Sequence, residues 1–368
     1  MDTNKPRIVI SAVNLTEMGT LTILRDCLTY AARELAAKYE IIALVNSKCL
    51  VDLPNIRYYE FPNIKRSWLK RVYYEYFGFK KLSKELNAFL WFSLHDMSAN
   101  VVAERRAVYF QNPSPFYSLK LTEFHIEPKF TLFNLFYLYL YRVNIRSNNF
   151  VVVQQDWLRR ELKRHFGTLN VVVANPALIP SEKRCSGRGP NSPNPTTTFL
   201  FPAYPRIHKN VEVIGRAVEV LLRRGVANFI VYLTLDGSEN RYAKRIVARF
   251  AHLNQIKFLG LLRREQVFEH YEKTDCLIFP SKLETWGLPI TEFKQFGKPM
   301  IVASSQYTPE TVGDYGRAVF FDPDDAEQLA NQMQRAIENR LEFPKRPPLA
   351  IDPPFARGWD GLFSILLK

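Results

Sequence analysis

Short apolar runs alternate with amphipathic stretches along most of this chain, and that alternation restricts its fold more than any other feature. Arg7–Ser11 is typical of a buried strand, and apolar residues then recur at helical spacing from Gly19 to Ala37. Repeated alternation of this kind is typical of a parallel sheet covered by helices. Further strands are expected at Ile41–Val45, Ile56–Glu60, Leu90–Leu94, Ala107–Phe110, Phe150–Val153 and Val171–Val173.

A second alternating series follows a stretch that has almost nothing to bury. Residues 181–198 are rich in Ser, Gly, Pro and Asn, which favours a linker or an exposed loop. Because 368 residues exceed the size of one ordinary core, two domains are expected, at 1–180 and 199–345, with a tail at 346–368. In the second series, strands are expected at Phe199–Phe201, Phe229–Leu235, Ile256–Phe258, Cys276–Phe279, Met300–Ala303 and Ala318–Phe321, and helices at Val211–Arg223, Arg241–Phe250, Glu265–Tyr271, Pro289–Phe296 and Ala326–Asn339.

Several protein classes are disfavoured. The four cysteines, Cys27, Cys49, Cys185 and Cys276, are far apart without CxxC spacing, which argues against zinc and a disulfide framework and favours a cytoplasmic location. The chain begins without the apolar region of a signal peptide, and no apolar run is long enough to span a bilayer. No GxGxxG follows the first strand and no GxxxxGK[ST] occurs, which disfavours nicotinamide or flavin enzymes and P-loop NTPases.

The segment Leu277–Ser304, LIFPSKLETWGLPITEFKQFGKPMIVAS, carries the densest chemical pattern. A buried strand is followed by a loop and then by a helix that begins at Pro289, and such a helix start leaves N–H groups for a phosphate. Glu284 precedes this start and Glu292 lies about one turn inside the helix. Since carboxylates accept hydrogen bonds from hydroxyls, the pattern favours a phosphate flanked by a ribose and a sugar. A capped helix with two solvated glutamates is the alternative.

This segment resembles the donor-binding motif of family 4 retaining glycosyltransferases of the GT-B fold. The resemblance is carried by Glu284-x7-Glu292 within PSxxExxGLPxxE and by the following GKPxIVAS. It implies two Rossmann-like domains, each a doubly wound parallel sheet, that face each other across a cleft. It implies that Glu292 binds the ribose hydroxyls and that Glu284 lies near the donor sugar. The amides of Trp286, Gly287 and Leu288 would contact the sugar and the diphosphate.

The resemblance extends almost continuously over residues 199–340. Phe201-Pro-Ala-Tyr-Pro-Arg-Ile-His-Lys209-Asn210 resembles the basic loop of the family, in which Lys209 would neutralise the donor diphosphate. The family usually has Arg where this chain has Tyr204, and Arg206 is a candidate substitute. Asp236 and Gly237 lie in LDGS, which resembles a Gly-rich turn of the donor site.

In the first domain the resemblance is looser. Gly19 follows the first strand and resembles a loop glycine that approaches the donor phosphates. His95 and Asp96 end a predicted strand and are candidates for a catalytic pair that faces the cleft, although a lone His at a strand end is often structural. Gln111 and Asn112 follow the next strand, where many relatives have a sugar-binding His, so these amides are candidates for sugar contacts.

The net charge is +14, which suits an anionic partner or a merely solvated basic face. Residues 65–84 mix Lys and Arg with six aromatic residues, a composition that suits an anionic membrane surface, stacking on nucleic acid, or a helix that packs its aromatics into the core. Phe130–Tyr141 is expected to be a buried helix or a lipid-facing wall. The tail resembles the final helix of the family, which crosses back to the first domain, with Trp359 as its tryptophan.

The resemblance implies a retaining hexosyltransferase that needs no cofactor and no metal and uses a UDP- or GDP-linked sugar. The acceptor would be a hydroxyl of a glycan or a polyprenyl-linked glycan, in the synthesis of O-antigen, capsule or exopolysaccharide. Peripheral contact with the inner membrane would run through residues 65–84, and no nucleic-acid partner is expected. A nucleotide-sugar epimerase or hydrolase of the same fold, or a non-catalytic protein that binds glycan or nucleic acid, remains as an alternative.

Overall fold

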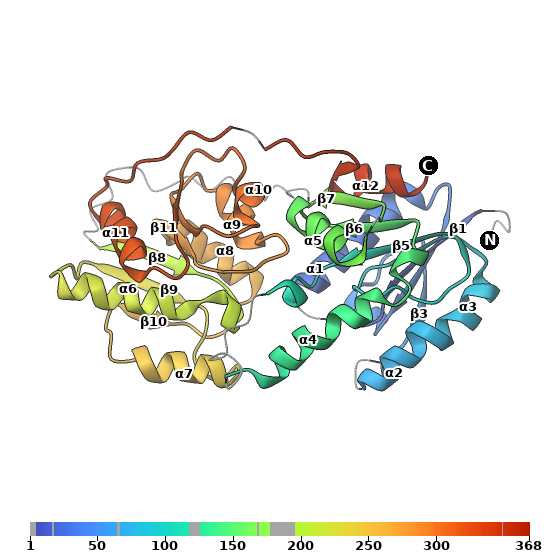
Figure 1. Ribbon diagram of the computed structural model, residues 1–368, viewed down its shortest axis with the longest axis horizontal. Helices are drawn as coiled ribbons and strands as arrows, with labels where there is room; N and C mark the ends of the chain where they lie inside the picture. Colours follow the sequence, from blue (N-terminus) through green and yellow to red (C-terminus); the bar gives the residue numbers. More distant parts are fainter. Residues whose placement is uncertain are drawn as a thin grey trace. The chain divides into compact units, whose positions relative to one another are not determined.

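The computed structural model describes residues 5–16, 18–64, 67–117, 126–167, 169–176, 196–347 and 349–368. The described chain forms two compact units, and each is considered by itself (Figure 1). Most of the predicted linker at 181–198 lies outside the described residues. Unit 1 comprises Met1–Phe116, Asn134–Ala177 and Ile351–Lys368, and unit 2 comprises Tyr117–Phe133 and Leu178–Ala350.

Unit 1 is built on a parallel sheet of eight strands in the order β14-β7-β6-β5-β4-β1-β2-β3. The chain winds outward from β1 in one direction through β2 and β3, and in the other direction through β4 to β7. The winding therefore reverses between β1 and β4. The strands are β1 (Arg7–Ala12), β2 (Glu40–Val45), β3 (Ile56–Glu60), β4 (Ala88–Ser93), β5 (Ala103–Phe110), β6 (Phe150–Val153), β7 (Val171–Asn175) and β14 (Phe355–Arg357).

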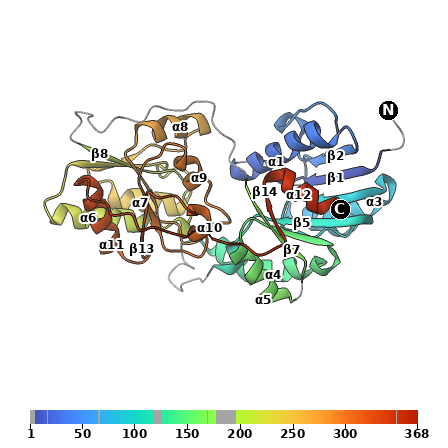
Figure 2. The same ribbon diagram turned by 90° about the horizontal axis from the view of Figure 1, so that it is seen from above.

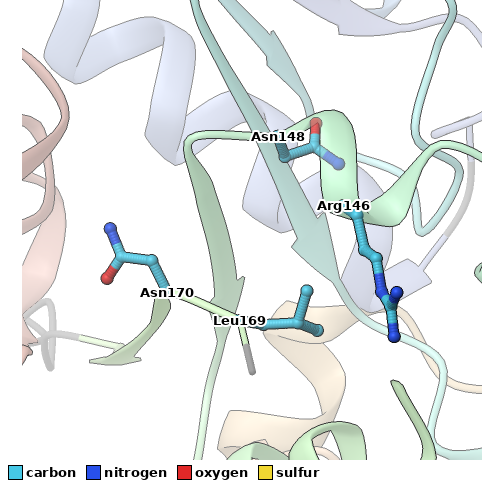
Figure 3. Close-up of a pocket in the computed structure, with 4 residues that line it drawn as sticks. All are labelled: Arg146, Asn148, Leu169 and Asn170. Carbon is cyan, nitrogen blue, oxygen red and sulfur yellow. The ribbon is translucent and has the colours of Figure 1, made fainter. Parts of the chain in front are cut away.

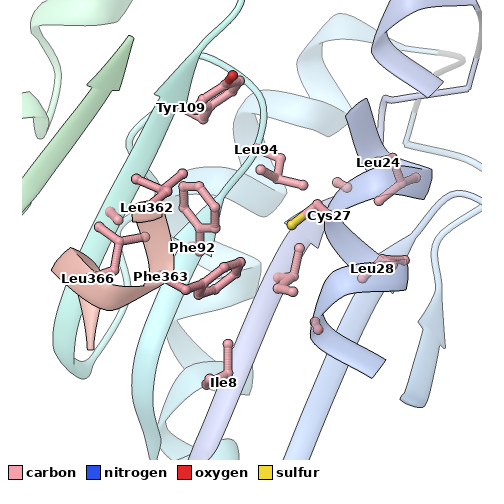
Figure 4. Packing of buried hydrophobic residues seen from close by; sticks show 14 of the residues in the cluster. Ile8, Leu24, Cys27, Leu28, Phe92, Leu94, Tyr109, Leu362, Phe363 and Leu366 are labelled. Carbon is pink, nitrogen blue, oxygen red and sulfur yellow. The ribbon is translucent and has the colours of Figure 1, made fainter. Parts of the chain in front are cut away.

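Both faces of this sheet are covered, which explains why its central strands are apolar throughout. Successive residues of β1 point to opposite faces. Ile8 and Ile10 join a cluster with helices α1 (Met18–Tyr30) and α12 (Gly358–Leu366), as Figure 4 shows. Val9 joins a second cluster, to which α3 (Phe79–Leu86) contributes Phe79 and Leu86.

The C-terminal segment completes unit 1. Strand β14 pairs in parallel with β7, and α12 follows it directly. Helix α12 lies beside α1 (Figure 2), where the rings of Tyr30 and Phe363 stack with centroids 5.6 Å apart. Trp359 packs on Tyr109 of β5 with ring centroids 6.0 Å apart. The short strand β14 was not among the strands expected from the sequence.

Two helical segments of unit 1 contain π-helical turns. The predicted helix Gly19–Ala37 is α1 followed by the π-helix η1 (Ala31–Leu35). The aromatic and basic segment forms α2 (Trp68–Tyr73), the π-helix η3 (Tyr74–Gly78) and α3. The predicted Phe130–Tyr141 helix lies within α4 (Pro128–Arg142), and α5 (Asp156–Phe166) joins β6 to β7. Among the described residues, no helix combines the length and apolarity that a membrane span requires.

Unit 2 is built on a parallel sheet in the order β10-β9-β8-β11-β12-β13. The predicted bounds of its last four strands agree with those observed, and α6 lies beside α11 (Figure 1). The strands are β8 (Thr197–Phe201), β9 (Phe229–Leu233), β10 (Ile256–Phe258), β11 (Cys276–Phe279), β12 (Met300–Ala303) and β13 (Ala318–Phe321). The helices are α6 (Val211–Arg223), α7 (Arg241–Phe250), α8 (Arg264–Lys273), α9 (Leu288–Lys294), α10 (Thr308–Val312) and α11 (Ala326–Ile337).

Candidate functional site

The topology of unit 2 indicates where a ligand binds. From β8 the chain winds one way to β9 and β10, whereas β11, β12 and β13 lie on the other side. The loops after β8 and β11 therefore leave the sheet in opposite directions and open a crevice at the carboxyl ends of these strands. Open α/β sheets bind ligands at such a switch point. The basic loop and the Glu284 loop of the sequence analysis are these two loops.

Lys209 and Glu284 meet across this switch point. Lys209 Nζ donates to Glu284 Oε1 at 2.5 Å, and their side chains are only 18% and 14% exposed. Glu284 is therefore not a solvated surface glutamate. A lysine held in this way has a defined position at the strand ends, which is where an anionic ligand needs a cation.

Asn210 holds the two loops together. Its φ of 56° is in the left-handed region, and its buried side-chain amide donates to the Pro280 carbonyl at 3.3 Å and the Pro323 carbonyl at 2.7 Å. The Lys282 amide also donates to the His208 carbonyl at 2.8 Å. The loops after β8, β11 and β13 are thus fastened to one another, so that Lys209 is fixed before any ligand arrives.

The loop between Glu284 and α9 is held from both sides. The indole of Trp286 is buried and donates to Thr291 Oγ1 at 2.8 Å, while the Thr311 hydroxyl donates to the Trp286 carbonyl. Gly287 has φ 87°, and a Cβ at this position would lie 3.3 Å from Tyr307 Cε2. Helix α9 begins at Leu288, one residue earlier than predicted, so Pro289 is its second residue.

Glu292 lies in α9 with its side chain 17% exposed. Its carboxylate accepts from Tyr271 OH at 3.1 Å and pairs with Arg264 Nη2 at 3.2 Å. Burial raises the pKa of Glu292, while Arg264 and the Tyr271 hydroxyl act in the opposite direction. Tyr271 and Arg264 come from α8 and carry no motif of their own, so the sequence analysis did not identify them.

Arg206 does not join the Lys209–Glu284 pair. Its guanidinium pairs with Glu127 at 3.3 Å and lies over the Tyr204 ring at 5.3 Å. The backbone amides of Asp236 and Gly237 donate to the Glu239 carboxylate at 2.9 and 3.0 Å, so these amides are bonded within their own turn. The donor-binding roles of these three residues stay predictions.

The expectation that the His95 side chain is open to a ligand is wrong, because it is fully buried. Its Nε2 lies 3.3 Å from Ser11 Oγ and 3.1 Å from Oε1 of Glu75, a residue that the sequence analysis did not identify. Gly19 is the second residue of α1, so it lies at the helix start where the predicted helix also begins, and its role toward the donor phosphates stays a prediction.

Asp96, Gln111 and Asn112 are brought together at the same edge of unit 1. Asp96 Oδ1 accepts from the Gln111 amide at 2.6 Å and from the Asn112 amide at 2.9 Å. The carboxamide of Gln111 donates to the Leu94 carbonyl at 2.5 Å. Asp96 thus shapes the loop that carries the predicted sugar contacts, and its Oδ1 is already occupied.

Two further observations on the described residues point to no second site for a nucleotide sugar. No group of three His, Cys, Asp or Glu side chains there is arranged to hold a metal ion. A pocket of about 360 Å³ in unit 1 is lined by Arg146, Asn148, Leu169 and Asn170 (Figure 3). It adjoins the first residues of β6 and β7, and hence the edge of the sheet opposite to that at which ligands bind.

Comparisons with known proteins show which sequences and structures this chain is similar to. Residues 188–347 match the family model of glycosyl transferases group 1. The chain is 27% identical over 132 residues to O-antigen chain mannosyltransferase B of Escherichia coli, an alignment that covers 36% of this chain and 34% of the relative. The matched part therefore spans about a third of that protein.

Two solved structures share the fold over most of their length. WaaG, a glycosyltransferase involved in lipopolysaccharide biosynthesis, superposes with a TM-score of 0.65 at 14% identity, covering 90% of each chain. Anabaena HepE in complex with UDP-glucose superposes with a TM-score of 0.61 at 15% identity, again over 90% of each chain. The predicted pair of doubly wound parallel sheets is confirmed. The chain therefore has the GT-B fold, and residues 188–347 carry a glycosyl transferases group 1 domain.

Proposed function

We propose that this protein is a retaining glycosyltransferase that moves a hexose from a nucleoside-diphosphate sugar to a hydroxyl of a glycan or polyprenyl-linked glycan. The observation that carries the proposal is the Lys209–Glu284 pair at the switch point of unit 2. Glu284 lies four residues before the half-buried start of α9 at Leu288. The matched domain and the named relatives, which act on O-antigen and lipopolysaccharide or hold UDP-glucose, support a nucleotide-sugar donor and a surface-glycan product.

Each residue then has a distinct task toward the donor. Lys209 stabilises the charge that develops on the leaving diphosphate, which is the task that a metal ion performs in other transferases. Glu292 accepts hydrogen bonds from the ribose hydroxyls, and Tyr271 and Arg264 keep its carboxylate in place. Glu284 lies beside Lys209 and faces the sugar. We propose on this basis that transfer is independent of metal and of any cofactor.

The anomeric configuration of the donor sugar is retained if the acceptor attacks from the face that the diphosphate leaves. The bond between the anomeric carbon and the diphosphate oxygen breaks as the bond to the acceptor oxygen forms on the same face. The acceptor hydroxyl proton passes to the departing phosphate oxygen, so no enzyme nucleophile is needed. From unit 1, Gln111 and Asn112 supply amide contacts to the donor sugar.

We propose further that unit 1 docks on the cytoplasmic face of a membrane, where polyprenyl-linked acceptors lie. Trp68, Leu69, Tyr73 and Phe77 on α2 and η3 are 47–78% exposed, and the rings of Tyr73 and Phe77 stack with centroids 6.0 Å apart. Phe136 and Tyr139 on α4 are 60% and 69% exposed, and α4 contacts α2 where Arg71 bonds with Tyr137. Exposed Lys80, Lys81 and Lys84 follow on α3. This combination of exposed rings and lysines suits an anionic bilayer surface.

The experiment is a screen of UDP-, GDP- and dTDP-sugars by thermal shift, followed by turnover with the donor that binds. We expect one donor class to raise the melting temperature of the protein and Glu292→Ala to abolish that shift. The product should keep the anomeric configuration of the donor, and EDTA should not reduce the rate. Free sugar released without acceptor as the main product would indicate an epimerase or hydrolase, and binding without any turnover would indicate a non-catalytic protein.

A further inference from the structure

Unit 1 has a switch point of its own, between β1 and β4, and a buried polar cluster lies at it. Ser11 is near the end of β1 and His95 follows β4, and His95 Nε2 lies 3.3 Å from Ser11 Oγ and 3.1 Å from Oε1 of the Glu75 carboxyl. Glu75 and His95 are both fully buried. Burying these groups is costly in free energy, so a cluster at this place is expected to serve something other than stability.

The cluster continues to α2 through Arg71. Arg71 Nη2 donates to the His95 carbonyl at 3.2 Å, and Arg71 lies four residues before Glu75. The π-helical turns of η3 intervene between α2 and α3, and such turns redirect side chains relative to a regular α-helix. Glu75 consequently points inward, while Tyr73 and Phe77 on the same segment are exposed.

On its other side the cluster borders the loop after β5. His95 lies between Leu94, whose carbonyl accepts from the Gln111 carboxamide, and Asp96, whose carboxylate accepts from the Gln111 and Asn112 amides. Asp96 has φ 55°, a left-handed conformation that is uncommon outside Gly and in which Asp is enriched. The turn from Leu94 to Asp96 is held from outside by the contact of Glu75 with the His95 ring and by the hydrogen bond from Arg71 to the His95 carbonyl.

We propose that Glu75 and His95 are positioning residues: they hold the Leu94–Asp96 turn and so fix the loop of Gln111 and Asn112 in the form that binds sugar. The sugar-binding part rests on the proposed function, whereas the effect on the loop does not. Neither side chain touches the ligand, because both are fully buried.

The protonation of the cluster fits this role. Burial raises the pKa of Glu75 to about 8, opposed by Arg71, and burial together with Arg71 lowers the pKa of His95 to about 3. Tyr76 on η3, Tyr137 and Tyr141 on α4, and Asp96 are the other titratable groups around Arg71 and Glu75. At neutral pH an uncharged carboxyl thus contacts an uncharged imidazole. Glu75 ionises as the pH rises through about 8, and the contact then places a buried anion at the turn.

Hydrogen exchange followed by mass spectrometry of the full chain tests the proposal. In Glu75→Ala, we expect peptides that contain Gln111 and Asn112 to exchange at least ten-fold faster than in the parent protein, with peptides over β11 of unit 2 unchanged. Glu75→Gln, which mimics the uncharged carboxyl, should restore slow exchange. The matched control is Glu85→Ala on α3, where the side chain is exposed. The protection factor of these amides should also fall above pH 8 in the parent protein and not in Glu75→Gln.

Unchanged exchange at Gln111 and Asn112 in a folded Glu75→Ala protein overturns the proposal. If that variant does not fold, His95→Gln removes the ring from the same contact and must give the faster exchange instead. Equal exchange in Glu75→Ala and Glu75→Gln would also count against it. Thermal shift with UDP-, GDP- and dTDP-sugars is measured in parallel. The absence of a shift with all of them in the parent protein would refute the proposed function and leave the exchange result standing.

Discussion

Lys209 and Glu284 are 75 positions apart in the sequence, yet their side chains form a hydrogen bond of 2.5 Å at the carboxyl ends of β8 and β11. The contact exists because these two strands are neighbours in the sheet although β9 and β10 lie between them in the chain. It joins the basic loop to the glutamate loop at the point where the winding of unit 2 reverses.

Replacing Lys209 by Met should reduce transfer by about 100-fold or more, because the leaving diphosphate loses a preorganised positive charge. The free energy of unfolding should fall by about 1–3 kcal/mol, since Glu284 loses its charged partner. The matched control is Lys282→Met, because the Lys282 side chain is also 18% exposed and pairs with Asp324. Turnover and urea unfolding measure the two effects. Equal activity of the two variants would contradict the role of Lys209.

Glu292 should make nucleotide binding sensitive to pH. Burial raises its pKa from the usual value of 4.5, so the carboxylate takes up a proton at a higher pH than an exposed glutamate does. UDP affinity should therefore weaken as the pH falls through this raised pKa, because a protonated carboxyl accepts fewer hydrogen bonds from ribose. Isothermal titration of the parent protein and Glu292→Gln measures this. The variant should bind UDP at least ten-fold more weakly and lack this part of the pH dependence; a shared pH profile would contradict the assignment.

The strands and most helices were predictable because short apolar runs are bounded by Pro, Gly or polar residues. The segment at Cys276–Phe279, for example, ends at Pro280, and its predicted bounds agree with β11. The predicted helix start between two glutamates indicated the segment around Glu284, and the resemblance to family 4 glycosyltransferases indicated the loop of Lys209. Their contact follows from strand order, which local patterns do not contain.

Partners that come from distant segments were not predictable. Arg206 was expected at the diphosphate, but its partner in the structure is Glu127, 79 positions away, in a segment without a motif. His95 was a candidate for a catalytic residue that faces the cleft, with a structural histidine as the alternative, because it follows a strand. Its burial depends on Glu75, which a π-helical turn directs inward, and such a turn leaves no periodic signal in the sequence.

Gly287→Ala should destabilise the loop before α9. The left-handed φ of 87° costs an Ala about 1–2 kcal/mol, and its Cβ would approach Tyr307 Cε2 to 3.3 Å. Gly225→Ala is the control for the first effect, since Gly225 has φ 76° and no atom within 4 Å of the added Cβ. We expect a larger loss of unfolding free energy at Gly287, measured by urea denaturation. Equal losses of unfolding free energy in the two variants would mean that the Tyr307 ring moves aside, and they would contradict the larger loss expected at Gly287.

Glu75 should make the free energy of unfolding of unit 1 decrease as the pH rises from 4.5 to about 8. Its folded-state pKa of about 8 lies above the unfolded value near 4.5, so the folded state holds the proton more tightly. The bound proton of Glu75 contributes fully to the free energy of unfolding below pH 4.5, and this contribution is lost as the pH rises to about 8. Glu75→Gln should remove this loss. The variant should gain stability relative to the parent protein between pH 5 and pH 9 in parallel urea unfolding, and a constant difference would contradict the raised pKa.

The exposed side chains of α2, η3 and α3 should bind unit 1 to anionic vesicles. Each of Lys80, Lys81 and Lys84 contributes about 1 kcal/mol near such a surface, so replacing all three by Gln should weaken binding about 100-fold. Phe77→Ser should weaken it separately, because its side chain is 66% exposed and is free to enter the interface. Leu261→Ser is the matched control, since Leu261 is a 54% exposed apolar residue of unit 2.

Sedimentation with vesicles that contain phosphatidylglycerol distinguishes the two contributions. Binding through the lysines falls as salt screens them, whereas the part that Phe77 supplies persists at high salt. A protein that merely carries a solvated basic face would lose all binding in salt and would not respond to Phe77→Ser. If Phe77→Ser weakened vesicle binding no more than Leu261→Ser does, the aromatic side chains of α2 and η3 would not enter the bilayer surface. That result would contradict the proposed docking of unit 1 on a membrane.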